Sequence, residues 1–101
     1  MVDRNLYTGL IRLHILHHAA EGDVFGQAMI DELGRHGYRL SAGTLYPILH
    51  GMERQGLLRS REKTTDGRKR RVYRATSAGR KALVVARKRV EELFGEMLEH
   101  S

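Results

Sequence analysis

The sequence contains no cysteine and no tryptophan, and its single proline is Pro47. Without cysteine, disulfide bonds and zinc sites built on thiolates are excluded. No run of apolar residues approaches the roughly 20 that a membrane-spanning helix needs, so we expect no contact with a membrane. The opening residues, MVDRNLYTGL, lack the pattern of a secretory signal, and we therefore expect a cytoplasmic protein.

Catalytic motifs are also missing. The sequence has no Ser/His/Asp set, glycine-rich phosphate loop or acidic metal cluster at a recognisable spacing, and its acidic residues are scattered over predicted helix faces. We therefore expect a protein that is not an enzyme and that requires no cofactor.

Acidic residues are rare in one third of the chain. The segment from Arg54 to Arg89 contains fourteen Lys and Arg residues but only two acidic residues, Glu62 and Asp66, so its formal charge is +12. The formal charge of all 101 residues is only +6. Such a concentration of positive charge is typical of a surface that binds nucleic acid, here double-stranded DNA. The alternative is a solvated basic face that only aids solubility.

The spacing of apolar residues predicts four helices and one hairpin. The first three helices are expected over residues 3–22, 23–37 and 41–55, with Asp23 and Ser41 as N-caps. Asp66-Gly67, between two segments of strand-like composition, is a strong hairpin signal. This order predicts a mainly α fold with a small β-hairpin. We expect a winged helix-turn-helix DNA-binding domain in residues 1–76, followed by a dimerisation helix in residues 77–101.

The last predicted helix has a narrow apolar seam and an unusual distribution of charge. Arg80 and Lys81 lie in its first turn and Glu96 and Glu99 near its last, against the direction that the helix dipole favours. A second copy packed antiparallel would bring acidic and basic halves together. We therefore predict a homodimer in which this helix also packs on the first one, through Leu83, Ala86, Val90, Leu93, Phe94 and Met97.

Pro47 stands inside the third predicted helix. Proline there removes a backbone donor and crowds the carbonyl four residues earlier, which costs about 3 kcal/mol. Gly43 supplies that carbonyl, and because it lacks a side chain it leaves room for the distortion. A functional gain must offset this cost, unless Pro47 only tunes helix packing.

The segment GTLYP at residues 43–47, followed by LHGMERQGLL and later by RRVYRATSAGR, resembles the PadR family of bacterial transcriptional regulators, in particular its short subclass. The resemblance covers nearly the whole chain. It implies a repressor that binds a palindromic operator as a homodimer. One departure is the segment Phe25-Gly26-Gln27-Ala28, where the family commonly has a stretch like Tyr-Gly-Tyr-Glu. The alternative function is a winged-helix protein that binds nucleic acid without sequence preference, for DNA packaging or RNA binding.

The resemblance implies that the third helix enters the major groove, and its N-terminal end is the one that meets DNA. We expect hydroxyl groups on this helix to reach phosphates or base edges and the Pro47 ring to make an apolar contact. The cations of the hairpin would enter the minor groove or pair with phosphates, while Tyr73 packs under the hairpin. The predicted DNA-binding residues are Ser41, Gly43, Thr44, Tyr46, Pro47, Arg68, Lys69 and Arg70.

The sequence leaves two kinds of effector to be considered, a divalent metal and an aromatic small molecule. His14, His17 and His18 share helix faces at spacings of three and four residues and could bind a divalent metal, or they could simply border a dimer contact. His36 and His50 are isolated in the sequence and are given no role. The PadR resemblance implies a planar aromatic compound between the first and last helices of the dimer. The candidate lining of that pocket is Tyr7, Ile11, Val90, Phe94 and Met97, which could equally be plain dimer core.

Overall fold

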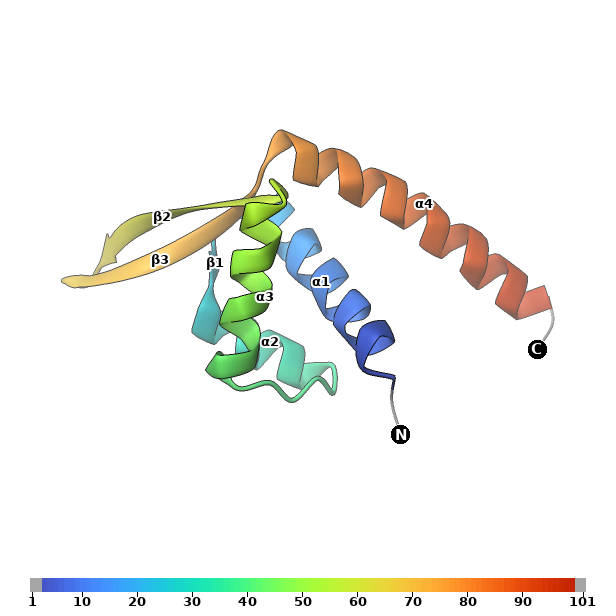
Figure 1. The fold of residues 1–101 in the computed structure, drawn as a ribbon, viewed down its shortest axis with the longest axis horizontal. Helices are drawn as coiled ribbons and strands as arrows, with labels where there is room; N and C mark the ends of the chain where they lie inside the picture. Colours follow the sequence, from blue (N-terminus) through green and yellow to red (C-terminus); the bar gives the residue numbers. More distant parts are fainter. Residues whose placement is uncertain (1–2, 100–101) are drawn as a thin grey trace.

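The computed structural model describes residues 3–99, and its elements follow the predicted order. The described helices are α1 (Arg4–Glu21), α2 (Gly26–Arg35), α3 (Ala42–Arg54) and α4 (Ser77–Glu99). The strands are β1 (Val24–Phe25), β2 (Leu58–Thr65) and β3 (Arg68–Ala75), which form an antiparallel sheet in the order β1-β3-β2 (Figure 1). The prediction of a mainly helical fold with a small hairpin is confirmed. Within this part of the chain no helix is long and apolar enough to cross a membrane.

The hydrophobic core lies between α1, α2, α3 and the base of the hairpin. Its largest fully buried side chains are Ile11, Ile15, Leu33, Leu45, Leu49, Met52, Leu58, Val72 and Tyr73. On α1, Ile11 and Ile15 face this core and are buried. Leu6 and Leu10 of the same helix are not covered and remain 66% and 46% exposed. A single chain covers only one of the two apolar sides of α1.

The helix starts differ in how they are capped. Asp3 caps α1 by accepting a hydrogen bond from the Leu6 N–H at 2.9 Å. The prediction that Asp23 caps the second helix is wrong, since α2 begins after β1 with Phe25 at the N-cap and no side-chain cap. Ser41 occupies the N-cap position of α3 as predicted, but its hydroxyl donates to Thr44 Oγ1 at 3.3 Å instead of capping the backbone.

The hairpin, which we call the wing (residues 58–75), is built as its Asp-Gly signal predicts. Asp66 and Gly67 both have positive φ, 52° and 74°, which is the requirement of a type I′ turn. The register runs without a bulge from Leu58 opposite Ala75 to Thr65 opposite Arg68. Tyr73 is completely buried at the base of the wing, which confirms its expected packing role. The two-residue strand β1 was not predicted, because so short a segment carries no alternating pattern.

The start of α4 is fixed to the base of the wing. Thr76 Oγ1 donates to the Gly56 carbonyl at 2.5 Å and accepts the Gly79 N–H at 2.9 Å. A Cβ atom on Gly79 would lie 2.1 Å from the Leu57 carbonyl oxygen, so only glycine fits this contact. Beyond this junction α4 runs beside α1 and away from the core, and α4 and the wing project in opposite directions (Figure 1).

Candidate nucleic-acid interface

The third helix has one buried side and one open side. Leu45, Leu49 and Met52 face the core. On the opposite side lie Gly43, Pro47, His50 and Arg54, all exposed and spaced four, three and four residues apart. We call these four residues the outer stripe of α3. Pro47 is exposed, so it lies at the surface and not inside the protein. Gly43, whose carbonyl Pro47 leaves without a helical hydrogen bond, is exposed as well, so that carbonyl lies in a stretch open to water.

Tyr46 and the wing line one open cavity of about 440 Å³, which we call the cationic hollow. Its walls are the start of α2, the side chain of Tyr46 and the first half of β3. The lining residues are Phe25, Gly26, Gln27, Tyr46, Arg68, Lys69, Arg70 and Arg71. Within residues 3–99 none of these four cations has a carboxylate partner. The hollow thus brings the predicted tyrosine and the three predicted wing cations to one side of the molecule.

The hollow also contains residues that were not predicted. Phe25 lies under the Arg70 guanidinium at 5.9 Å, and Gln27 is exposed on the first turn of α2. The sequence offered a signal for them, because Phe25 and Gly26 stand where the resemblance shows its departure. What the sequence could not show is that the second helix starts beside the wing.

Tyr46 is held in place by its contact with the start of α2. A Cβ atom on Gly26 would lie 2.1 Å from the Tyr46 hydroxyl oxygen, so the ring fills the space that glycine leaves. Tyr46 is half-buried, and its ring lies 6.1 Å from that of His50. The packing gives Tyr46 a structural role between α2 and α3 in addition to the predicted contact with DNA.

Asp23 is the centre of an ion-pair cluster on one face of the wing. Its carboxylate accepts two hydrogen bonds from Arg61 and one from Lys63, all at 3.1 Å, and Arg74 lies 3.8 Å away. The hydrogen bonds from Arg61 and then Lys63 lower the pKa of Asp23 from 3.8 to about 2. Asp23 thus joins the loop after α1 to both strands of the wing, which explains why it does not cap α2.

A second carboxylate joins α3 to the wing. Glu53 Oε2 accepts the Ser60 N–H at 3.1 Å and the Ser60 hydroxyl at 2.7 Å, and Arg71 donates to the same hydroxyl oxygen at 3.0 Å. The Tyr73 hydroxyl is buried nearby without a hydrogen bond among the residues described. Asp23 and Glu53 therefore fix the orientation of the wing relative to α3.

The remaining predicted DNA-binding residues lie outside the hollow. Ser41 borders the turn between α2 and α3, beside Tyr38 and Arg39. Thr44 is exposed but faces α1, where it lines a separate cavity with Tyr7. Their contact with DNA stays a prediction, and they belong to the tip of α3.

The effector pocket was predicted in the dimer, and within a single chain the residues predicted to line it do not share one cavity. A cavity of about 480 Å³ between α1 and α4 is lined by Leu10, Leu13, His14, His17, Leu83, Arg87, Val90 and Glu91. Of the five predicted lining residues only Val90 is among them. Tyr7 turns the other way, donating to the Gly37 carbonyl at 3.1 Å, and Ile11 is buried in the core. Phe94 and Met97 are each 60% exposed farther along α4.

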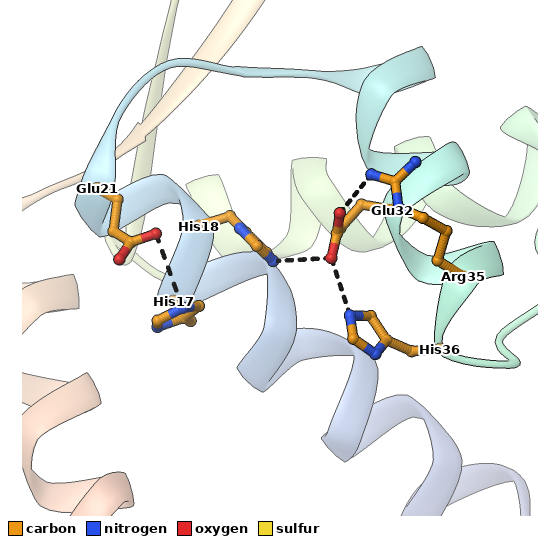
Figure 2. A network of polar contacts seen from close by, with 6 residues as sticks. All are labelled: His17, His18, Glu21, Glu32, Arg35 and His36. Atoms are coloured by element: carbon orange, nitrogen blue, oxygen red, sulfur yellow. Dashed lines mark hydrogen bonds and ion pairs between the residues drawn. The ribbon is translucent and has the colours of Figure 1, made fainter.

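The histidines of α1 do not form one cluster. His17 lies 3.7 Å from Glu21, whereas His18 points to Glu32 of α2, also at 3.7 Å (Figure 2). The ligand atoms of His17, His18 and Glu21 lie within 4.8 Å of one another, and this is the one metal-capable group of three within residues 3–99. The predicted group of His14, His17 and His18 is therefore not assembled.

His14 belongs to a different environment, shared with the end of α2. Its ring lies 4.9 Å from that of His36 and 5.3 Å from that of Tyr38, so His36 is not isolated in the fold. Burial, with His36 and His18 nearby, lowers the pKa of His14. His36 Nε2 is 2.8 Å from Glu32 Oε2, and Arg35 also pairs with Glu32 (Figure 2). The hydrogen bond from Arg35 and then that from His36 lower the pKa of Glu32 to about 2.

Comparison with known proteins gives a consistent result. Residues 15–85 match the transcriptional regulator PadR-like family. Transcriptional regulator Rv3488 of Mycobacterium tuberculosis is 56% identical over 95 residues, which cover 94% of this chain and 89% of that protein. A PadR family transcriptional regulator from Eggerthella lenta has a TM-score of 0.77 at 30% identity, covering 96% of this chain and 88% of the other. A PadR-like regulator from Bacillus cereus has a TM-score of 0.80 at 25% identity, covering 93% and 96%.

The contacts of Asp23 generate a test of the wing. Asp23→Asn keeps the size of the side chain but removes the charge that holds three cations. We expect a lower Tm at pH 7, measured by circular dichroism in low salt. Because the folded pKa of about 2 lies below the ordinary 3.8, the stabilisation is present above about pH 4 and is lost as the pH falls through 2. The two melting curves should therefore converge in acid.

The matched control is Asp31→Asn. Asp31 is exposed on α2 and accepts one hydrogen bond, from Gln27 at 3.2 Å, with no cation paired to it among residues 3–99. Its variant should melt close to the wild type at both pH values. If Asp23→Asn and Asp31→Asn lower the Tm at pH 7 equally, the ion-pair cluster does not hold the wing.

Proposed function

The chain belongs to the PadR-like family of transcriptional regulators, which are DNA-binding regulators and not enzymes, and from this premise we propose that it is a repressor that binds a palindromic operator as a homodimer. The single observation that carries the proposal is the cationic hollow beside the tip of α3, where four cations of β3 lie without carboxylate partners among the described residues. A repressor of this kind acts in the cytoplasm, where the DNA is.

The tip of α3 suits close contact with DNA. Ala42 and Gly43 open the helix, and both are exposed and small, so the helix can come near the floor of the major groove. The free N–H groups of the first turn, at the positive end of the helix dipole, favour a phosphate. Pro47 then presents a stiff apolar ring to the groove, which suits the methyl group of a thymine. This contact is the functional gain that offsets the cost of a proline inside α3.

The wing supplies the second contact. Arg68 and Lys69 follow the turn at its tip, so they lie at the point of the wing farthest from the core. Cations in that position can enter the minor groove beside the site occupied by α3, or pair with the phosphates that flank it. Asp23 and Glu53 restrict the motion of the wing, which favours a fixed spacing between the two contacts.

The homodimer is supported by apolar surface that one chain leaves open. The large exposed apolar side chains of α1 and α4 are Leu6, Leu10, Val84, Val85, Val90, Leu93, Phe94, Met97 and Leu98. So many large exposed apolar side chains on two neighbouring helices favour a protein interface there. Of the seam residues predicted to form the dimer, Leu83 and Ala86 are partly covered by their own chain, and the other four are exposed.

The charge of α4 favours an antiparallel arrangement of two chains. Its first half carries Arg80, Lys81, Arg87, Lys88 and Arg89, and its second half carries Glu91, Glu92, Glu96 and Glu99. Within one chain these groups form a single ion pair among the described residues, between Arg89 and Glu92 at 3.8 Å. A second α4 running in the opposite direction would place each basic half beside an acidic one. The two DNA-binding heads would then lie at opposite ends of the dimer.

The proposal also includes a small-molecule effector that binds between α1 and α4. The cavity between α1 and α4 is lined by four apolar side chains, one cation, Arg87, and one carboxylate, Glu91, with His14 and His17 on its other side. This lining suits a planar aromatic acid, with the ring against Leu10 and Val90 and the carboxylate towards Arg87. Because the cavity touches the proposed dimer helices, occupancy would change the spacing of the two heads and release the operator.

The first prediction concerns sequence-specific binding. On DNA flanking its own gene, the wild type should protect a palindromic site and bind it at least ~10³-fold more tightly than random duplex. Arg68→Ala should weaken binding and flatten the salt dependence by ~0.9 in log–log slope for each phosphate that the variant no longer neutralises. Footprinting and fluorescence anisotropy at several salt concentrations measure both quantities.

Arg35→Ala is the control, because it removes an exposed cation of α2 outside both the cationic hollow and the proposed dimer helices. It should leave the salt slope unchanged.

Tyr46→Ala should lose the protected site, because it removes both the Tyr46 hydroxyl and the packing of the ring against Gly26. Equal affinity for the operator and for random duplex would instead establish the alternative, a winged-helix protein without sequence preference.

The second prediction concerns the dimer. Phe94→Glu places a charge in the middle of the exposed seam of α4. We expect the dimer dissociation constant to rise at least about 30-fold, as for an interface hot spot, and the palindromic site to be lost with it. Sedimentation equilibrium measures the association. Thr64→Glu adds the same charge on an exposed strand of the wing and should leave the dimer intact. A Phe94→Glu protein that remains dimeric would place the interface elsewhere.

The third prediction concerns the effector. Calorimetry should detect binding of a hydroxylated aromatic acid to the wild type, and Val90→Trp, which fills the cavity, should abolish it. The same compound should release the wild type from its operator. A divalent metal is tested alongside, with zinc, cadmium and nickel. Binding that disappears in His17→Ala would assign the effector site to His17, His18 and Glu21. A loss only in His14→Ala would contradict that group.

A further inference from the structure

The outer stripe of α3 contains an imidazole that the proposed function has not used. His50 is exposed, and among residues 3–99 it forms no hydrogen bond or ion pair. Its one ring contact is the Tyr46 ring at 6.1 Å. This makes it unlike His17, His18 and His36, each of which faces a carboxylate. The fold therefore leaves both ring nitrogens of His50 open to a partner outside the chain.

The neighbours of His50 on the outer stripe are short or apolar. Gly43 has no side chain, Pro47 has no polar atom in its ring, and Gly51 follows His50 directly. Arg54 is the other polar member, but it lies about 17 Å from Gly43 along the helix axis at a rise of 1.5 Å per residue. If α3 enters the groove with its N-terminal end first, Arg54 therefore lies too far from that end to contact the bases. His50 is the polar side chain of the stripe nearest to the helix tip.

The direction of the side chain brings the imidazole closer to that tip. Side chains of a helix lean towards its N-terminus, so the ring of residue 50 covers the preceding turn, at the level of Pro47. That level is about 6 Å along the axis from Gly43, within the ~8.5 Å depth of the major groove. The contact with Tyr46, which precedes Pro47, agrees with this direction. The half-buried tyrosine forms one side of the space that the imidazole occupies.

We propose that His50 is a specificity-determining residue that donates a hydrogen bond to a guanine in the major groove of each half-site. This inference rests on the proposed function, because it requires α3 in the major groove. An imidazole always carries at least one N–H donor. Guanine offers two acceptors on its major-groove edge, N7 and O6, whereas adenine offers N7 beside an amino donor, thymine offers only O4 beside a methyl group, and cytosine offers only a donor. A single N–H therefore favours guanine over the other bases.

The test uses a randomised operator library and modified bases. With the wild type, one position in each half-site should select guanine, and 7-deazaguanine there should weaken binding about 5- to 10-fold, as for the removal of one good hydrogen bond to a base. His50→Ala should lose both the preference at that position and the sensitivity to 7-deazaguanine, while the preferences at other positions persist. His50→Gln should shift the preference towards adenine, since a glutamine amide pairs with adenine N6 and N7.

Circular dichroism first confirms that each variant is folded, which the exposure of residue 50 leads us to expect. The matched control is His36→Ala, an exposed histidine at the end of α2, which should leave all base preferences intact. If the wild type selects an operator but His50→Ala keeps every preference, or loses affinity equally for all sequences, the inference about His50 is wrong and the proposed function stands. If the wild type selects no sequence at all, the proposed function itself is wrong.

Discussion

Like charges on neighbouring strands repel one another, and the wing carries eight Lys and Arg residues on β2 and β3. Asp23 and Glu53 hold this ribbon against the body of the protein, from the loop after α1 and from α3. Each carboxylate comes from an element that is itself packed into the core. The position of every other cation relative to α3 depends on these two anchors. Because Asp23 pairs with Arg61, Lys63 and Arg74, the wing cations left without a carboxylate among the described residues are Arg59 and the four of the first half of β3.

Much of the fold could be predicted from local patterns. The four helices follow from apolar spacing, and the wing follows from Asp66-Gly67, whose backbone angles only a few residue types adopt readily. The start of α2 could not be predicted in this way. Asp23 is a good N-cap residue, but a carboxylate with three cations nearby gains more from ion pairs, and the strands that carry those cations lie about forty to fifty residues away. The helix-capping propensity of a residue carries no information about a contact so distant in the sequence.

The candidate site, like the fold, could be predicted where it depends on local sequence and not where it depends on packing between helices. The motif at residues 43–47 and the charge of the wing identify most of the surface, and the cavity beside Tyr46 unites both. The role of Tyr46 as a wedge against Gly26 needs the packing of α2 on α3, which no spacing encodes. The histidines illustrate the same limit. Spacing on one helix groups His14 with His17 and His18, but the fold sends His14 to His36 and His18 to Glu32.

The junction at Thr76 and Gly79 has a mechanical consequence. Gly79 touches the Leu57 carbonyl, and Leu57 connects the end of α3 with the start of β2, so α4 and the DNA-facing elements meet at one rigid point. From there α4 extends for 23 residues, or about 34 Å. It therefore acts as a lever arm whose fulcrum is this junction. A tilt of roughly 10° at the fulcrum displaces the far end by about 6 Å over that length. Small rearrangements at the root of α4 are thereby amplified into large changes at its tip.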